Sequence, residues 1–400
     1  MKEGSKTMQK TREVFEKGNG IIRLRPNFVA FDVSKPGFRL KLHPDDYYGL
    51  GMGKTAIKER LLASVMQPSS MVDTGAEESD ISLRDMVEEL GVDIIGPQLM
   101  AMHGTWPMHA KFFDYGEPLF HHLHLDFDAA ARIGQLGKPE AYYFPPQMNN
   151  HPGTFPHTYF GFDPSVTREM VRERLADFER RDTRITELSR AFRIELGTGW
   201  YVPGGILHAP GSYCTYEPQW NSYSGASFQN VVAGQVFNMD GIRRSCPEDK
   251  RDDMDYIMSL IDWDKNVDPN FRETYFRPPV ICTDEDTHME KWVTYNNPYF
   301  SAKELTVYPG QTVTIKDTAA YGCVFVQGHG RFGVFDAETP TLIRFGKRTA
   351  DEYFVSESAA QAGVIIENKS EFEPIVILKH FADNCLYNTS TSAATTVSIS

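Results

Sequence analysis

The chain has 400 residues, 41% of them hydrophobic and 12% aromatic, which is enough to build buried cores in two or three domains. Lysine and arginine total 41 against 54 aspartate and glutamate, a formal net charge of -13, and no basic run tracks phosphates, so nucleic acid is not an expected partner. The polar first 20 residues lack the apolar core of a signal peptide, and no stretch reaches the roughly 18 apolar residues of a membrane helix, so we expect a cytoplasmic protein. The 5 scattered cysteines form no C-x-x-C pair, so we expect no disulfide framework.

The first half of the chain predicts strands interrupted by two helical segments. Residues 21–41 alternate apolar and polar positions in short runs broken by Pro and Gly, which is typical of an all-β module. Residues 80–95 contain Ser82 with an acid three positions later, then apolar residues at helical spacing and Gly91 as a stop, which predicts one short surface helix. Residues 164–191 are densely charged with apolar residues every three or four positions, which predicts a helical insertion.

The second half predicts a connector and a second β block. Residues 245–263 have a helical pattern, and an aromatic-rich stretch then leads into strands closed by Gly and Pro turns, as expected of a divergent duplication. The two histidines of that block, His329 and His380, stand alone, so we expect it to bind no metal. The predicted organisation is an N-terminal segment (1–20), a metal-binding β domain (21–243), a helical and irregular connector (244–297), a metal-free β barrel (298–384) and a tail (385–400).

The chemistry is concentrated in the sequence HHLH at 121–124. Residues i and i+2 of a strand point to the same face, so His122 and His124 can project into one cavity while His121 and Leu123 point the other way. Only the His122/His124 pair can then chelate an ion. The alternative is a surface histidine cluster that binds no metal.

Two more candidate ligands follow in the chain. Glu140 begins a predicted strand after Gly-Lys-Pro, and His208 follows a Pro-Gly bend at Pro203–Gly205 that leaves it facing inward on the next strand. Three imidazoles and one carboxylate suit a divalent ion, zinc first, with manganese or ferrous iron as alternatives.

These segments resemble the type I mannose-6-phosphate isomerases of the cupin superfamily. The family pattern is a strand with a lysine, then L-S-x-Q-x-H-P-D, G-K-x-E, P-x-G-x-x-H and E-x-Q; it is matched here by Lys111 in WPMHAKFFDYG and by LFHHLHLD, GKPE, VPGGILH and EPQ. The resemblance covers about residues 80 to 235 and, more loosely, the C-terminal block. It implies a mostly β fold of two tandem cupin barrels with a helical insertion.

The resemblance also implies roles for single residues. The family's metal ligands fall on His122, His124, Glu140 and His208; in addition, its proton-transfer acid falls on Glu217 and its motif lysine on Lys138. The expected reaction is aldose–ketose isomerisation of a small-molecule sugar through an enediolate, with Lys138 as an electrostatic or hydrogen-bonding partner. Gln219 would orient Glu217 or pair with the main chain. Possible walls of the sugar pocket are Trp106, Phe120 and Tyr142.

Two departures from the family concern the phosphate. Phe120 stands where the family has a serine, and no arginine occurs near Ser227, where the family has one; the next arginine is Arg243. A hydroxyl and a guanidinium are donors that hold a phosphate dianion well, and an aromatic ring favours a neutral sugar face. We therefore expect a sugar that is not phosphorylated, or an atypical one.

Two other functions fit the same residues. A centre of three histidines and one glutamate would suit iron in a cupin oxygenase, and a non-catalytic cupin would bind a sugar without proton exchange. The second barrel is expected to pack against the first or to form a subunit contact, as in a homodimer.

Overall fold

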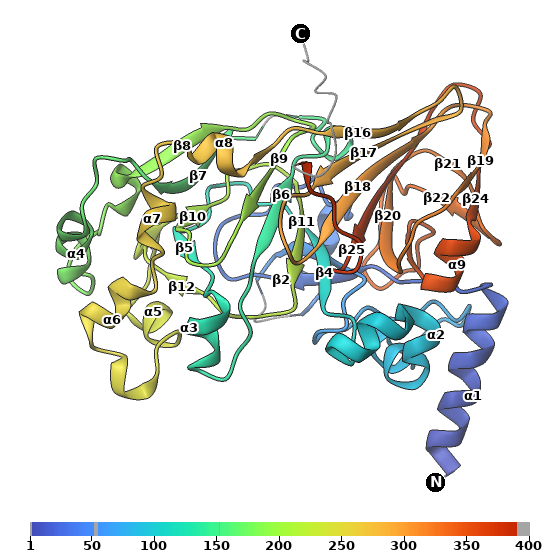
Figure 1. Cartoon of the computed structure of the whole chain (residues 1–400), viewed down its shortest axis with the longest axis horizontal. Helices are drawn as coiled ribbons and strands as arrows, with labels where there is room; N and C mark the ends of the chain where they lie inside the picture. Colours follow the sequence, from blue (N-terminus) through green and yellow to red (C-terminus); the bar gives the residue numbers. More distant parts are fainter. Residues whose placement is uncertain (1, 52–54, 152, 390–400) are drawn as a thin grey trace.

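The computed structural model describes residues 2–51, 55–151 and 153–389, and in this part of the chain two pairs of antiparallel sheets dominate. Figure 1 shows the first pair in teal and green on the left and the second in orange and red on the right. The predicted fold class, mostly β with two cupin-like sheet pairs, is confirmed.

The first pair consists of a seven-stranded and a five-stranded sheet. The seven-stranded sheet contains, in spatial order, β15 (Phe276–Arg277), β9 (Gly199–Val202), β6 (Glu140–Tyr143), β11 (Thr215–Trp220), β4 (Met108–Phe113), β3 (Ile57–Leu62) and β2 (Asn27–Ala30). The five-stranded sheet contains β12 (Ala226–Ser227), β5 (His122–Leu123), β10 (His208–Ala209), β7 (His157–Phe162) and β8 (Ser189–Arg193). Large side chains such as Phe113, Tyr142, Phe160 and Trp200 fill one buried cluster between them.

The second pair consists of a seven-stranded and a four-stranded sheet. The larger contains β1 (Ile21–Arg23), β23 (Glu352–Val355), β20 (Tyr321–Gln327), β25 (Ile375–Phe381), β18 (Ser301–Val307), β17 (His288–Thr294) and β16 (Val280–Asp284). The smaller contains β19 (Thr312–Ile315), β24 (Val364–Asn368), β21 (His329–Phe332) and β22 (Phe335–Glu338). A short hairpin, β13 (Val231–Val232) and β14 (Gln235–Val236), stands apart.

Strand pairing differs from the predicted organisation at two places. β1 lies in the stretch expected to open the first β domain, but it pairs with β23 of the second sheet pair. β16 and β17 lie in the expected connector, yet they extend the second sheet beside β18. Alternation along a strand shows which side chains are buried but not which strand lies next to it, so such exchanges cannot be read from periodicity. The segment boundaries therefore stay predictions, and residues 390–400 of the expected tail lie outside the described residues.

The helix expected over 80–95 begins as predicted but is longer. α2 (Leu83–His103) starts at Ser82, whose hydroxyl accepts from the Asp85 backbone N–H while the Asp85 carboxylate accepts from the Ser82 N–H. Gly91 does not stop it; the helix breaks at Gly96, with φ 82°, and ends at Gly104. As expected of a surface helix, one face is exposed, and its apolar face fills a core cluster together with Trp106.

The two expected helical stretches are broken into short pieces. Residues 164–191 form α4 (Arg168–Ala176) and η3 (Ile185–Leu188), and β8 then begins. Residues 245–263 form η4 (Glu248–Lys250) and α6 (Met254–Ser259), because Asp253 accepts from the N–H groups of Asp255 and Tyr256 and so begins a new helix. The remaining helices are α1 (Lys2–Lys17), α3 (Phe127–Ala131), α5 (Asp240–Arg243), α7 (Trp263–Asn266), α8 (Phe271–Tyr275), α9 (Glu357–Ala362), η1 (Pro44–Asp46) and η2 (Pro146–Met148).

The two seven-stranded sheets pack against each other. A buried cluster that includes Phe112 and Tyr216 of the first sheet, and Val324 and Leu378 of the second, joins them. The second pair therefore supports the outer face of the sheet whose inner face lines the site described below. In the described part of the chain, no helix combines the length and the apolar character needed to cross a bilayer.

Candidate metal centre and catalytic cavity

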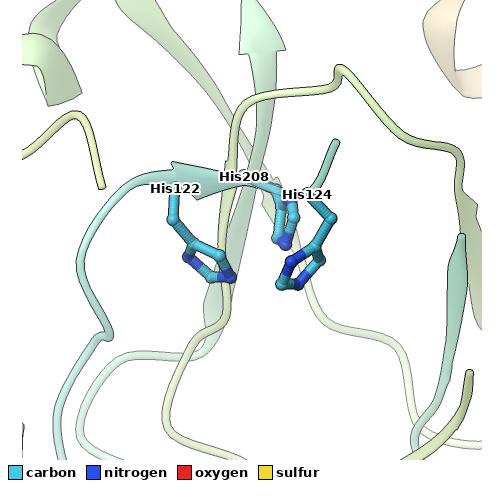
Figure 2. A group of neighbouring side chains, drawn as sticks. All are labelled: His122, His124 and His208. Carbon is cyan, nitrogen blue, oxygen red and sulfur yellow. The ribbon is translucent and has the colours of Figure 1, made fainter. Parts of the chain in front are cut away.

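Three histidines converge inside the first sheet pair. His122 in β5 and His208 in β10 are direct cross-strand partners, so their side chains leave the sheet on the same face. His124 lies two residues after His122 and faces the same way. Their ligand atoms lie within 4.8 Å of one another, and Figure 2 shows the three rings pointing toward a common centre.

The main chain fixes which ring nitrogen faces that centre. The Nδ1 atoms of His122, His124 and His208 lie 2.9, 2.7 and 2.8 Å from the carbonyl oxygens of Phe120, Ser224 and Ile206, respectively. A carbonyl oxygen can only accept, so each Nδ1 carries the hydrogen, and in the neutral ring each Nε2 presents a lone pair. Burial lowers the pKa of His122 and, with Lys138, lowers that of His124 to about 4, so both rings are neutral at neutral pH.

Glu140 completes the set from the opposite sheet. Its carboxylate oxygens lie 2.9 Å from Nε2 of His124 and 3.0 Å from Nε2 of His208. These contacts are not hydrogen bonds, because both partners are acceptors once Nδ1 holds the hydrogen. Although burial alone would raise the pKa of Glu140, the ammonium group of Lys138 helps to hold it well below its usual value.

Lys138 contacts this cluster directly. Its ammonium lies 3.0 Å from Nε2 of His124 and 3.2 Å from a Glu140 oxygen. It also lies 3.9 Å from Oε1 of Glu217. The structure thus brings together all six residues that the sequence singled out as ligands or catalytic groups.

Glu217 lies in β11, in a cavity of 330 Å³ that His122, His124 and Glu140 also line. It is 3% exposed, and its Oε1 has no hydrogen-bond partner among the described residues, with Lys111 at 3.5 Å. Burial, followed by the charge of Glu140, raises the pKa of Glu217 to about 8, against the pull of Lys111 and Lys138. A carboxyl group that titrates near neutral pH can hold or release a proton there.

The pKa of Glu217 predicts a dependence of stability on pH in the metal-free protein. The carboxyl titrates near 4.5 when the chain is unfolded and at about 8 when it is folded, so between these values only the unfolded state ionises. Its contribution to stability is therefore complete below pH 4.5 and is lost as pH rises toward about 8. The Glu217→Gln variant cannot ionise at this position. Its melting temperature should equal that of the wild type at low pH and exceed it above pH 8.

This prediction is checked by thermal unfolding of chelator-treated protein across that pH range. Glu273→Gln, an exposed position on α8, corrects for the general loss of one negative charge. Melting curves of Glu217→Gln and wild type that run parallel at every pH would contradict a raised Glu217 pKa.

The cavity holds further groups that no sequence motif singled out as functional. Glu59 of β3 accepts from Tyr115 Oη at 2.7 Å and lies 3.2 Å from Lys111, and His109 also lines the cavity. Glu59 and His109 come from the neighbouring strands β3 and β4 of one sheet, so only the pairing register of these strands brings them together.

The predicted pocket walls are partly corrected. Phe120 and Tyr142 line the cavity, but Trp106 does not: it is fully buried and packs edge-on against Phe354. An arginine also reaches the rim, contrary to the expectation from the stretch around Ser227. It is Arg244, just after α5, whose Nε lies 3.4 Å from the Gly225 carbonyl oxygen.

No protein-family model matches the chain, and no curated protein matches its sequence. Solved structures match its fold. A putative mannosephosphate isomerase from Archaeoglobus fulgidus aligns with a TM-score of 0.60 at 15% identity over 90% of this chain and 97% of its own. The mannose 6-phosphate isomerase from Bacillus subtilis aligns with a TM-score of 0.63 at 16% identity, over 90% of this chain and 99% of its own. A mannose 6-phosphate isomerase bound with zinc and yttrium aligns with a TM-score of 0.62 at 10% identity, over 91% of this chain and 99% of its own. The chain therefore has the fold of the mannose-6-phosphate isomerases.

Proposed function

We propose that this protein is a metal-dependent aldose–ketose isomerase that acts on a non-phosphorylated or otherwise atypical sugar. The observation that carries the proposal is the meeting of two features in one cavity. One is the acceptor cluster of His122, His124, His208 and Glu140, which calls for a cation. The other is Glu217, a buried carboxyl group whose pKa of about 8 suits proton transfer.

Glu217 would remove and return the proton next to the carbonyl group of the sugar. Glu217 lines the cavity and its Oε1 accepts no hydrogen bond from the described residues, and a base with a pKa near the working pH is the most effective for such a step. Lys111 and Lys138, at 3.5 and 3.9 Å, would stabilise the carboxylate after it gives the proton back. The ion, with zinc proposed ahead of manganese and iron, would supply Lewis-acid stabilisation of the negative charge that develops on the sugar oxygens.

The walls of the cavity support a largely neutral sugar. Phe120 occupies the wall next to His122 and packs with Phe31 at a centroid distance of 6.3 Å. Aromatic rings offer a face for the C–H side of a sugar ring but no donor for a phosphate dianion. Of the described cations that line the cavity, Lys111 and Lys138 already face the carboxylates of Glu59, Glu140 and Glu217, and Arg244 is exposed.

The proposal is tested by proton exchange. Metal-loaded protein is incubated in deuterated water with free and phosphorylated aldoses and ketoses, and deuterium at C1 or C2 is followed by NMR together with interconversion of the sugars. We expect label and interconversion with a free sugar, and neither with chelator-treated protein.

Other outcomes identify the alternatives. Oxygen uptake that depends on iron would replace the isomerase by a cupin oxygenase. Tight sugar binding without label would indicate a non-catalytic sugar-binding protein. Mannose 6-phosphate as the best substrate would refute the argument from Phe120.

A further inference from the structure

A chain of three side chains, half-buried Asn221 and buried His109 and Gln219, leads from the main chain at Trp106 to the cavity. Asn221 Nδ2 donates to the Trp106 carbonyl oxygen at 2.7 Å, and Asn221 Oδ1 lies 2.7 Å from His109 Nδ1. His109 Nε2 lies 2.9 Å from Gln219 Nε2, and these two residues are cross-strand partners in β4 and β11. His109 is 3% and Gln219 5% exposed, so water does not compete for these contacts.

The direction of every hydrogen bond in this chain follows from its first member. The Trp106 carbonyl can only accept, so the NH₂ group of Asn221 faces it and Oδ1 faces His109. His109 must then carry its hydrogen on Nδ1. Burial lowers the pKa of His109 to about 4, so the ring is neutral and Nε2 accepts from the NH₂ group of Gln219. The Gln219 oxygen therefore points away from His109.

That oxygen, Oε1 of Gln219, is left without a partner. It is buried and accepts no hydrogen bond from the described residues, although Gln219 lines the cavity. Gln219 pairs in register with Glu140 and lies two positions after Glu217, on the same face of β11. A buried acceptor without a donor is unfavourable unless a ligand supplies the donor.

We propose that Gln219 is a specificity-determining residue whose Oε1 accepts a hydrogen bond from a sugar hydroxyl, and that His109 and Asn221 are positioning residues. The proposal rests on the proposed function, because it concerns the sugar bound in the same cavity. A free glutamine amide could present either its oxygen or its NH₂ group. The fixed chain selects the oxygen, so this position favours a hydroxyl, which can donate, over fluorine or a phosphate oxygen, which can only accept.

The test compares sugars that differ at one hydroxyl. Binding of D-mannose, D-fructose and their 6-phosphates to metal-loaded protein is measured by calorimetry, and then binding of the monodeoxy and monodeoxyfluoro analogues of the tightest one. At one ring position, both analogues should bind the wild type on the order of 10- to 100-fold more weakly than the parent sugar. The Gln219→Met variant should bind all three alike. Gln147→Met is the control, because the Gln147 oxygen also lacks a partner among the described residues but lies outside the cavity.

A second variant tests the positioning residues by spectroscopy. In the wild type, ¹⁵N NMR should show His109 with its proton on Nδ1. Asn221→Ala removes the acceptor, so the proton should distribute over both nitrogens while the metal content stays unchanged, and the preference for the hydroxyl should weaken.

Each result decides one question. Equal sugar binding by wild type and Gln219→Met, full recovery of affinity by a fluoro analogue, or a wild-type His109 proton on Nε2 overturns the assignment of Gln219. Binding that depends on Gln219 without deuterium at C1 or C2 upholds the assignment and refutes the isomerase.

Discussion

The His208→Ala variant is expected to lose its metal ion and all metal-dependent turnover while keeping its fold. His208 is fully buried, and its ring is held from behind by the Ile206 carbonyl at 2.8 Å. Changes in the residues that merely support a ligand cost about 10- to 100-fold in metal affinity. Loss of the ligand itself should therefore exceed 100-fold. The cost is large because the cluster in the described part of the chain contains only three histidines, and His109, which also lines the cavity, is already held by Asn221 and Gln219.

The measurement is metal content by elemental analysis after dialysis against a competing chelator. His121→Ala is the matched control: His121 is just as buried, but its Nδ1 lies 3.2 Å from Gln229 Oε1 and it belongs to no metal cluster in the described residues. It should lose stability as any buried residue does and still hold one ion. Circular dichroism verifies folding of both variants. Retention of one tightly bound ion by His208→Ala would remove His208 from the ligand set.

The sequence predicted the convergence of the three histidines because their arrangement is local. His122 and His124 are two positions apart in one strand, and the Pro-Gly bend before His208 fixes where the next strand starts. Main-chain geometry alone then turns all three rings inward. The carbonyl oxygens of Phe120 and Ile206 lie only two positions before the histidines that they orient. The one that orients His124 could not be predicted, because Ser224 lies 100 positions away and carries no signal of its role.

The rest of the cavity depends on strand register. Glu59, Lys111 and Glu217 are neighbours because β3, β4 and β11 lie side by side, and alternation shows only that each faces inward. The same limit explains the misplaced β1 and the strands found in the expected connector. The end of α2 was misjudged for a different reason: Gly91 suggested a stop, whereas tertiary packing carries the helix on to His103.

Replacing Glu217 by glutamine is expected to lower kcat by a factor of about 10² to 10⁴, the range typical of removing a general base. Glutamine keeps the shape of the side chain but cannot take a proton. Metal content should not change, because Glu217 contacts Lys111 and Lys138 rather than a histidine. Glu217→Asp keeps the carboxylate but moves it, and a misplacement of about 1 Å is enough to cost on the order of 100-fold.

The pH profile separates this role from a structural one. The wild-type rate should rise as Glu217 ionises, with a midpoint below the value of about 8 found for the metal-free site, because a bound cation favours the carboxylate. The residual activity of Glu217→Gln should lack that transition, whereas a residue needed only for folding would lower the rate equally at every pH. Full activity of Glu217→Gln would transfer the role to Glu59, which lines the same cavity and already shares Lys111 with Glu217.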